Sequence, residues 1–230
     1  MNIEKIVEEA FELYMPQDKD EITQLAQFMS QQVQQGVDIC MGRDIEVPKP
    51  YNVLEIGTKF GGTFYIWNKI IEDHGAGMCI SIDMSDGGIH GGIEDEMMDA
   101  RDLVFKRTFN DCHFIRGDSH HYSTYSKVQM VLRPNASGYV YGMPYADVDF
   151  FFIDGDHTYE GVKQDFEMYS PFVKKGGCIA FHDINDTQRH RDRNVYVGKF
   201  WNEIKNDKRF ETVEFNSNLD WAGIGVLIVK

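Results

Sequence analysis

Residues 53–62 read VLEIGTKFGG. An apolar run that carries one carboxylate, Glu55, leads into a turn with three glycines, and an amphipathic segment follows. This pattern predicts a buried strand, a tight loop and the first turn of a helix. Glycine lets the loop backbone approach a ligand closely, and the start of a helix offers unpaired N–H groups and partial positive charge to an anion. We therefore expect a ligand with a carboxylate or a phosphate at this turn.

The bulk composition limits the class of protein and its partners. The 230 residues suit a single α/β domain with a large core. A formal net charge of −14 argues against a nucleic-acid partner, because proteins that hold phosphates usually present a basic face. The cysteines (Cys40, Cys79, Cys112 and Cys178) show neither zinc spacing nor a redox pair, so we interpret them as reduced thiols in a cytoplasmic protein. No run is long or apolar enough for a bilayer and no leader is evident, so we expect no membrane contact.

Residues 1–50 carry two runs of apolar residues at helical spacing. The first run is Ile3, Ile6, Val7, Ala10, Phe11 and Tyr14, and the second, after Pro16, is Ile22, Leu25, Ala26, Met29 and Val33. We predict an N-terminal helical extension over residues 1–50 and a main domain over residues 51–230. The two helices either cover the functional site or form a contact in a homo-oligomer, and the sequence leaves both open.

From residue 51 onward, strand and helix patterns alternate. We predict strands at 51–56, 78–83, 112–116, 148–153 and 178–182, with helices at 62–73, 94–108, 121–132 and 158–173. A helix at 196–206 and strands at 211–215 and 221–229 follow. Such alternation predicts an α/β fold with parallel βαβ units, in which ligands bind beyond the carboxyl ends of the strands. The long connections at 84–93, 133–146 and 184–194 are interpreted as functional loops.

Acidic residues stand at the carboxyl ends of successive predicted strands. They are Glu55, Asp83, Asp118, Asp154 and the pair His182-Asp183. Because these ends meet at one edge of a parallel sheet, we expect the side chains to lie together. Asp83 follows the second strand, where an acid accepts hydrogen bonds from ribose hydroxyls in nucleotide-binding folds. Asp118 and Ser119 either contact an adenine amino group or cap the helix that follows.

The spacing of the glycine turn discriminates between two nucleotide cofactors. A dinucleotide site has the pattern G-x-G-x-x-G, whereas here three residues separate Gly57 from Gly61, and Glu55 precedes them. A carboxylate at this position suits a ligand with a positive amino group better than a pyrophosphate. A nucleoside that ends in an amino acid meets both requirements, which favours S-adenosylmethionine over NAD.

Five segments between residues 51 and 183 carry a family resemblance. They are the glycine turn, SID at 81–83, RGDS at 116–119, FIDGDHTYEGV at 152–162 and GGCIAFHD at 176–183. Together they resemble class I S-adenosylmethionine-dependent methyltransferases. More narrowly, they resemble the metal-dependent O-methyltransferase branch, which includes catechol O-methyltransferase-like enzymes and the cephalosporin-hydroxylase and macrolide-sugar O-methyltransferase group. The resemblance implies a Rossmann-like three-layer sandwich whose seven-stranded, mostly parallel sheet has an antiparallel last strand.

The resemblance also implies residues for a cofactor and a metal. The cofactor set is Glu55, Gly57, Thr58, Gly61, Gly62, Asp83, Asp118, Ser119 and Asp154. In metal-dependent members a divalent cation is held at the ends of strands four and five, which corresponds to Asp154, His182 and Asp183 here. Histidine at 182 departs from the usual acid or amide, and its softer nitrogen shifts preference from Mg²⁺ toward Mn²⁺, Fe²⁺ or Zn²⁺. Alternatively, His182 or His157 acts as a general base.

The resemblance implies O-methylation of a small hydroxylated acceptor, such as a sugar or a secondary metabolite. S-adenosylmethionine is the expected cofactor, with Mg²⁺ or Mn²⁺ assisting, and Asp154, His182 and His157 are the candidate catalytic residues. The arginines at 189, 191 and 193 indicate an anionic acceptor or form an exposed charge run. Competing interpretations are a metal-independent methyltransferase, an oxidoreductase or hydroxylase on the same fold, and a cofactor-binding protein without catalysis.

Overall fold

The protein is built on one seven-stranded sheet. The computed structural model describes residues 1–12, 15–34, 37–40, 45–84, 111–133, 147–217 and 219–230. The predicted helix 94–108 and, apart from their first residues, the predicted loops 84–93 and 133–146 lie outside these residues. The strand order is β5-β4-β3-β6-β7-β9-β8. The strands are β3 (Val53–Ile56), β4 (Met78–Asp83), β5 (Asp111–Arg116), β6 (Val148–Ile153), β7 (Val173–His182), β8 (Phe210–Phe215) and β9 (Ile224–Val229).

The sheet is parallel from β5 to β7, and only β9 runs against its neighbours. This arrangement confirms the predicted mostly parallel sheet with an antiparallel last strand. Ile56 at the end of β3 pairs with Ile82 in β4 and with Ile153 in β6. The carboxyl ends of the central strands therefore lie level with one another, so the loops that follow them share one edge.

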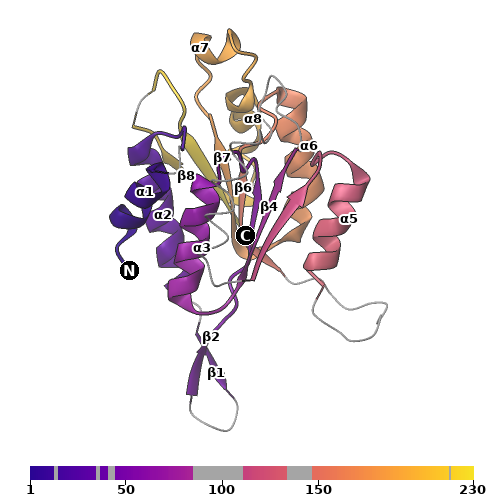
Figure 1. Cartoon of the computed structure of the whole chain (residues 1–230). Helices are drawn as coiled ribbons and strands as arrows, with labels where there is room; N and C mark the ends of the chain where they lie inside the picture. The colour runs from indigo at the N-terminus through magenta and orange to yellow at the C-terminus, as the bar shows by residue number, and fades with distance from the viewer. Residues whose placement is uncertain (13–14, 35–36, 41–44, 85–110, 134–146, 218) are drawn as a thin grey trace.

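Helices cover both faces of the sheet (Figure 1). On one face lie α1 (Ile3–Phe11), α2 (Lys19–Gln34) and α3 (Gly62–His74); on the other lie α5 (Tyr122–Val131), α6 (Tyr159–Tyr169) and α8 (Val197–Ile204). The central strand β6 serves both cores, since Phe150 and Phe152 face the α1–α3 layer and Phe151 faces the other. The two helices of the expected N-terminal extension thus share a hydrophobic core with α3 and the sheet.

Some predicted boundaries are wrong for identifiable reasons. Helix α6 ends at Tyr169 and a 3₁₀ turn, Ser170–Phe172, carries Pro171, which cannot continue an α-helix. Strand β9 begins at Ile224 instead of residue 221, because Ala222 and Gly223 have positive φ angles of 47° and 87°.

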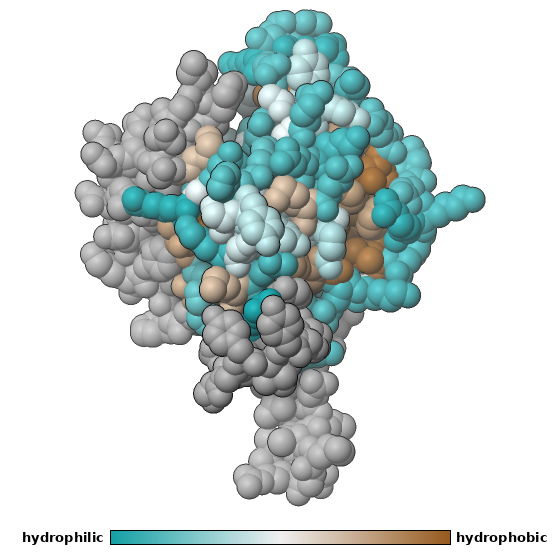
Figure 2. Space-filling model, turned by 90° about the vertical axis from the view of Figure 1, so that its right-hand side faces the viewer, coloured by the Kyte–Doolittle hydropathy of each residue, from teal (hydrophilic) through white to brown (hydrophobic). Residues whose placement is uncertain are grey.

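Two short elements were not expected from the sequence. The hairpin of β1 (Val37–Cys40) and β2 (Ile45–Pro48) projects from the end of the molecule opposite to the helix α7 (Gln188–Arg191), as Figure 1 shows. Helix α7 lies within the predicted loop 184–194, and hydrophilic residues cover the end of the molecule that carries it (Figure 2). Within the described residues, no helix combines the length and the apolar character that a membrane crossing needs.

Candidate active site

A cavity of about 340 Å³ opens beyond the carboxyl ends of β3, β4, β6 and β7. All of the predicted site residues except Glu55 and Gly61 line it: Gly57, Thr58, Gly62, Asp83, Asp118, Ser119, Asp154, His157, His182 and Asp183. The expectation that strand-end side chains gather at one edge is therefore confirmed for this set. Three residues of the N-terminal region, Met15, Pro16 and Gln17, also line the cavity.

The glycine turn lies tightly against the end of β6. Gly57 has a φ of 93° and its N–H donates to the carbonyl oxygen of Ile82 at 2.9 Å. A Cβ on Gly57 would collide with the backbone carbonyl of Asp154. The backbone N–H groups of Thr58 and Lys59 both donate to Asp83 Oδ2, at 2.9 and 2.6 Å. Asp83 therefore holds the turn from the neighbouring strand end.

The first turn of α3 borders the cavity and has no side-chain cap. Gly61 takes the N-cap position with a φ of 85°, and no side chain caps the helix there. Its own N–H donates to the carbonyl oxygen of Thr58 at 2.7 Å. A Cβ on Gly62 would lie 2.8 Å from Met15 Cβ, so the segment between α1 and α2 packs directly on this turn. Gly61 itself does not line the cavity, but it places the helix start beside it.

Glu55 lies beneath the turn instead of in the cavity wall. Its side chain is fully buried, and it accepts hydrogen bonds from Trp67 Nε1 at 2.8 Å and from Ser81 Oγ at 3.0 Å. Burial raises the pKa of Glu55 to about 8, although the hydrogen bonds from Thr63, Ser81 and Trp67 lower it. Direct contact with a cofactor amino group, as the sequence predicts, would have to compete with these buried partners.

The buried Glu55 makes stability depend on pH. Its folded-state pKa of about 8 exceeds the ordinary value of 4.5, so between these values the folded state binds more protons than the unfolded state. As the pH rises through this range, ionisation of Glu55 should therefore lower the free energy of unfolding by up to about 1.4 kcal/mol for each pH unit. Glu55→Gln keeps the shape, and Ser81 can turn its hydroxyl to accept from the amide. Denaturant unfolding between pH 5 and 8 should show a smaller fall in the free energy of unfolding for Glu55→Gln than for wild type. An equal fall in both proteins would contradict the raised pKa of Glu55.

Asp118 and Ser119 form the turn that precedes α5. Asp118 Oδ1 accepts from the backbone N–H of His120 at 2.8 Å, and the N-cap of α5 is His121. The alternative that Asp118 caps this helix is therefore wrong. The carbonyl oxygen of Ser119 accepts from the Tyr169 hydroxyl at 2.7 Å, which ties the turn to α6. The adenine contact stays a prediction.

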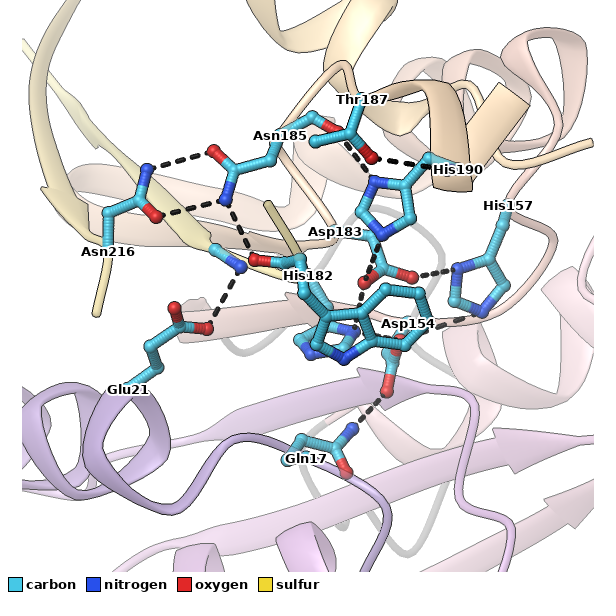
Figure 3. A network of polar contacts seen from close by, with 12 residues as sticks. Gln17, Glu21, Asp154, His157, His182, Asp183, Asn185, Thr187, His190 and Asn216 are labelled. Atoms are coloured by element: carbon cyan, nitrogen blue, oxygen red, sulfur yellow. Dashed lines mark hydrogen bonds and ion pairs between the residues drawn. The ribbon is translucent and has the colours of Figure 1, made fainter. Parts of the chain in front are cut away.

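Two carboxylates and two imidazoles converge at the ends of β6 and β7 (Figure 3). His182 Nδ1 lies 3.1 Å from Asp154 Oδ1 and 3.4 Å from Asp183 Oδ1. His157 Nδ1 lies 2.9 Å from Asp183 Oδ2, and its Nε2 lies 3.7 Å from Asp154 Oδ1. We call these four residues the acid–histidine cluster. It joins every candidate for catalysis and metal binding in one place.

The charged groups of the cluster shift one another's pKa values. Burial alone would lower the pKa of His182, but the carboxylates of Asp183 and Asp154 raise that pKa to about 10. Burial likewise opposes ionisation of Asp183, yet His182 and His157 hold the pKa of Asp183 well below its usual range. The pKa of His157 is also raised, because Asp183 and Asp154 more than offset its burial. The two carboxylates thus favour positive charge between them.

The comparison with known families decides between the nucleotide-fold alternatives. A family model described as a methyltransferase domain matches residues 54–184. The chain belongs to this methyltransferase family. The matched segment begins in β3 and ends just after the acid–histidine cluster, so it contains the whole cavity edge except the N-terminal residues and Trp221.

The methyltransferase is similar to curated sequences and to solved structures. An uncharacterized protein of Sinorhizobium fredii is 23% identical over 157 residues, which are 68% of this chain and 15% of that protein. The chain spans less than a fifth of the length of the curated relatives it matches. The O-methyltransferase of Bacillus cereus, solved with SAH, has 15% identity and a TM-score of 0.58, with 100% of both chains covered.

A second solved structure extends this agreement. The MycE methyltransferase of the mycinamycin biosynthetic pathway, solved with Mg and SAH, has 13% identity and a TM-score of 0.58, covering 100% of this chain and 55% of that one. At these identities the likeness shows the fold alone. The predicted class I methyltransferase fold is thereby confirmed.

The methyltransferase contains site residues that sequence reasoning missed. Gln17 Nε2 donates to Asp154 Oδ2 at 2.5 Å. His190 Nε2 lies 3.5 Å from Asp183 Oδ1, while its Nδ1 lies 2.5 Å from the carbonyl oxygen of Asn185. Each of these residues brings a further polar group to one carboxylate of the cluster, from elements outside β6 and β7.

The segment between the two N-terminal helices lines this site, and α2 is fixed close to it. Glu21, fully buried in α2, accepts from the backbone N–H groups of Gly223 at 2.9 Å and Ser217 at 3.0 Å. These bonds fix α2 to the segment between β8 and β9. The helices themselves pack on the sheet face and only Met15, Pro16 and Gln17 line the cavity, so both a cover over the site and a homo-oligomer contact stay predictions.

The donor set of the cluster suits a cation in its chemistry, but its arrangement is closed. Asp154, His182 and Asp183 supply oxygen and nitrogen donors, and buried His182 Nε2 has no hydrogen-bond partner in the described part of the chain. Their donor atoms nevertheless contact one another, and no group of three or more His, Cys, Asp or Glu side chains among the described residues is arranged to hold a metal ion. The metal therefore stays a prediction.

Proposed function

We propose that this methyltransferase transfers the methyl group of S-adenosylmethionine to a hydroxyl of a small molecule. One observation carries the proposal: the glycine turn held by Asp83 and the acid–histidine cluster line the same cavity. The glycine turn is suited to binding a nucleoside, and the acid–histidine cluster is suited to accepting the proton of a hydroxyl. The B. cereus O-methyltransferase and MycE, which share the fold, were solved with SAH and so support the cofactor.

In this proposal the cofactor lies along the turn. The carboxylate of Asp83 accepts three backbone N–H groups, including that of Met84 at 2.7 Å. Since a carboxylate has about four acceptor positions, one is left for a ribose hydroxyl. The uncapped start of α3 offers N–H groups to the amino-acid carboxylate. Asp118 and Ser119 lie on the wall where adenine would sit.

Removing the Asp83 carboxylate should weaken cofactor binding. Asp83→Ala loses the proposed ribose bond and the two bonds that hold the turn. We expect S-adenosylmethionine affinity to fall by about 1.5–3 kcal/mol, the scale of hydrogen bonds to a charged group. Calorimetry measures this directly, with NAD as the comparison ligand. Unchanged affinity would refute the ribose assignment, and tight NAD binding without a response to S-adenosylmethionine would favour an oxidoreductase.

Methyl transfer needs a hydroxyl in line with the sulfonium and a place for its proton. The carboxylates and imidazoles of the acid–histidine cluster lie at this point, with Gln17 orienting Asp154 and His157 orienting Asp183. Asp154, His182 and Asp183 would hold a divalent cation, which lowers the pKa of a bound hydroxyl and fixes its orientation. MycE, solved with Mg, supports this part of the proposal.

A metal-free route has its own support. His157 is the most exposed member of the cluster, at 27% of its side chain, and Asp183 orients it through Nδ1. An imidazole held in this way by a carboxylate is suited to general-base work through its other nitrogen. In this route His157 accepts the hydroxyl proton, and the closed arrangement of the donors needs no cation.

A chelator separates the two routes. If a cation is required, excess EDTA should abolish turnover while leaving S-adenosylmethionine affinity nearly unchanged, because the ribose and carboxylate contacts involve no metal donor. Re-addition of Mn²⁺ should restore the rate. Full activity in excess EDTA, together with loss of activity in His157→Gln, would instead establish the metal-free route.

A further inference from the structure

Two arginine side chains lie over Trp221 at the rim of the cavity. Arg189 Cζ is 3.8 Å from the centroid of the Trp221 ring, and Arg193 Cζ is 5.1 Å from it. Both arginines are exposed, whereas Trp221 is half-buried and lines the cavity. The tryptophan thus connects two cationic groups in solvent to the interior of the site.

The neighbouring arginine shows a different arrangement. Arg191 Nη1 forms an ion pair with Asp186 Oδ1 at 2.5 Å and also donates to the carbonyl oxygen of Asp186 at 3.1 Å. Neither Arg189 nor Arg193 has an ion pair with a carboxylate in the described part of the chain. The chain has 37 acidic and 23 basic residues. An exposed charge run alone therefore does not explain why two guanidinium groups lie over one indole ring in so acidic a protein.

Stacking leaves the guanidinium groups able to bind an anion. An aromatic ring covers one face of the planar group and stabilises its charge. The N–H donors point outward in the plane, where they match the oxygens of a carboxylate or phosphate. Trp221 therefore fixes Arg189 without using its hydrogen-bonding capacity.

A continuous series of contacts leads from this rim to the acid–histidine cluster. The ring of Trp221 lies 4.9 Å from that of His190, and His190 Nε2 lies 3.5 Å from Asp183 Oδ1. His190 is almost fully buried and links Trp221 to Asp183 through these two contacts. Trp221 lines the same cavity as the cluster, so a molecule in contact with Trp221 has the cluster on one side and the two arginines on the other.

We propose that the methyl acceptor carries an anionic oxygen group, a carboxylate or a phosphate, that binds to Arg189 and Arg193 while its hydroxyl points to the acid–histidine cluster. This inference rests on the proposed O-methylation. The net charge of −14 and the two cluster carboxylates repel an anion. The arginine pair offsets this repulsion at the rim and orients the molecule with its hydroxyl inward.

The test compares paired ligands, one with an anionic oxygen group and one without it. The probes are 3,4-dihydroxybenzoate against its methyl ester, and glucose 6-phosphate against glucose, added to protein loaded with S-adenosylhomocysteine. Binding is followed by tryptophan fluorescence, since Trp67 and Trp201 are buried and Trp221 alone among the three tryptophans is open to solvent. The variant is Arg189→Gln with Arg193→Gln, and Arg191→Gln is the matched control.

We expect at least one anionic probe to bind wild type about tenfold or more tightly than its neutral partner, a difference of about 1.4 kcal/mol. The double variant should lose this preference and Arg191→Gln should keep it. A wild type that prefers neither anion, or a preference that survives in the double variant, would overturn the proposal. Methyl transfer to neutral acceptors alone would overturn this inference but leave O-methylation standing, whereas anion binding without methyl transfer to any acceptor would overturn O-methylation and leave only an anion site at the two arginines.

Discussion

Replacing Asp154 with asparagine should lower kcat for methyl transfer by at least about a hundredfold, the lower end of what positioned acid–base groups contribute. Asp154 is the only side chain that contacts Gln17, His157 and His182 together in the described residues. The variant keeps the shape but removes the charge that the imidazoles and a cation would share. Steady-state rates with labelled S-adenosylmethionine measure the effect.

The control for Asp154 lies two residues away on the same loop. Asp156 also lines the cavity, but its Oδ1 accepts from the backbone N–H of Thr158 at 2.9 Å and so serves the start of α6. Asp156→Asn keeps an oxygen for that bond, so its rate should stay close to wild type. Equal losses of rate in Asp154→Asn and Asp156→Asn would mean that catalysis depends on the total charge in the cavity and not on the acid–histidine cluster.

Replacing Gly57 with alanine should destabilise the fold by more than about 3 kcal/mol and abolish cofactor binding. A left-handed φ of 93° is strained for alanine, and the added methyl would also strike the carbonyl of Asp154. The collision forces the end of β3 away from the end of β6. Because the turn and the cluster share this contact, both sites should be disturbed. Denaturant unfolding and calorimetry with S-adenosylmethionine give the two readings.

Gly176 offers a control position that has the backbone strain of Gly57 without the collision. Its φ of 77° is also left-handed, but nothing lies within 4 Å of the position that a Cβ would take. Gly176→Ala should therefore cost only about 1–2 kcal/mol of conformational strain and leave cofactor binding intact. If the two alanine variants cost the same, the close approach of the turn to Asp154 would not be a determinant of the fold.

The parts of this protein that the sequence predicts well are local in sequence. The glycine turn combines an apolar run, positive-φ positions and a helix start within ten residues. Repeated strand-and-helix periodicity then places Asp83, Asp154 and Asp183 at the same edge without further information. These local patterns are sufficient to place the ligand site at the carboxyl ends of the strands.

The missed residues depend on contacts between distant parts of the chain. Gln17 and Asp154 are 137 residues apart, and Glu21 and Gly223 are 202 residues apart. No local pattern marks Gln17 as a partner of a strand-end carboxylate. His120 shows the same difficulty, because its partner Asp165, 3.1 Å away, is buried within α6. Glu55 shows the converse: the strand pattern locates it near the end of β3, but only packing shows that Trp67 and Ser81 donate hydrogen bonds to its oxygens.

The most direct test of the central claim is a crystal structure of the protein with S-adenosylhomocysteine and Mn²⁺. We predict the ribose at Asp83, the amino-acid carboxylate at the start of α3, and anomalous density for manganese among Asp154, His182 and Asp183. A ligand held away from Asp83 would contradict the account, and manganese bound only elsewhere would leave the metal-free route alone.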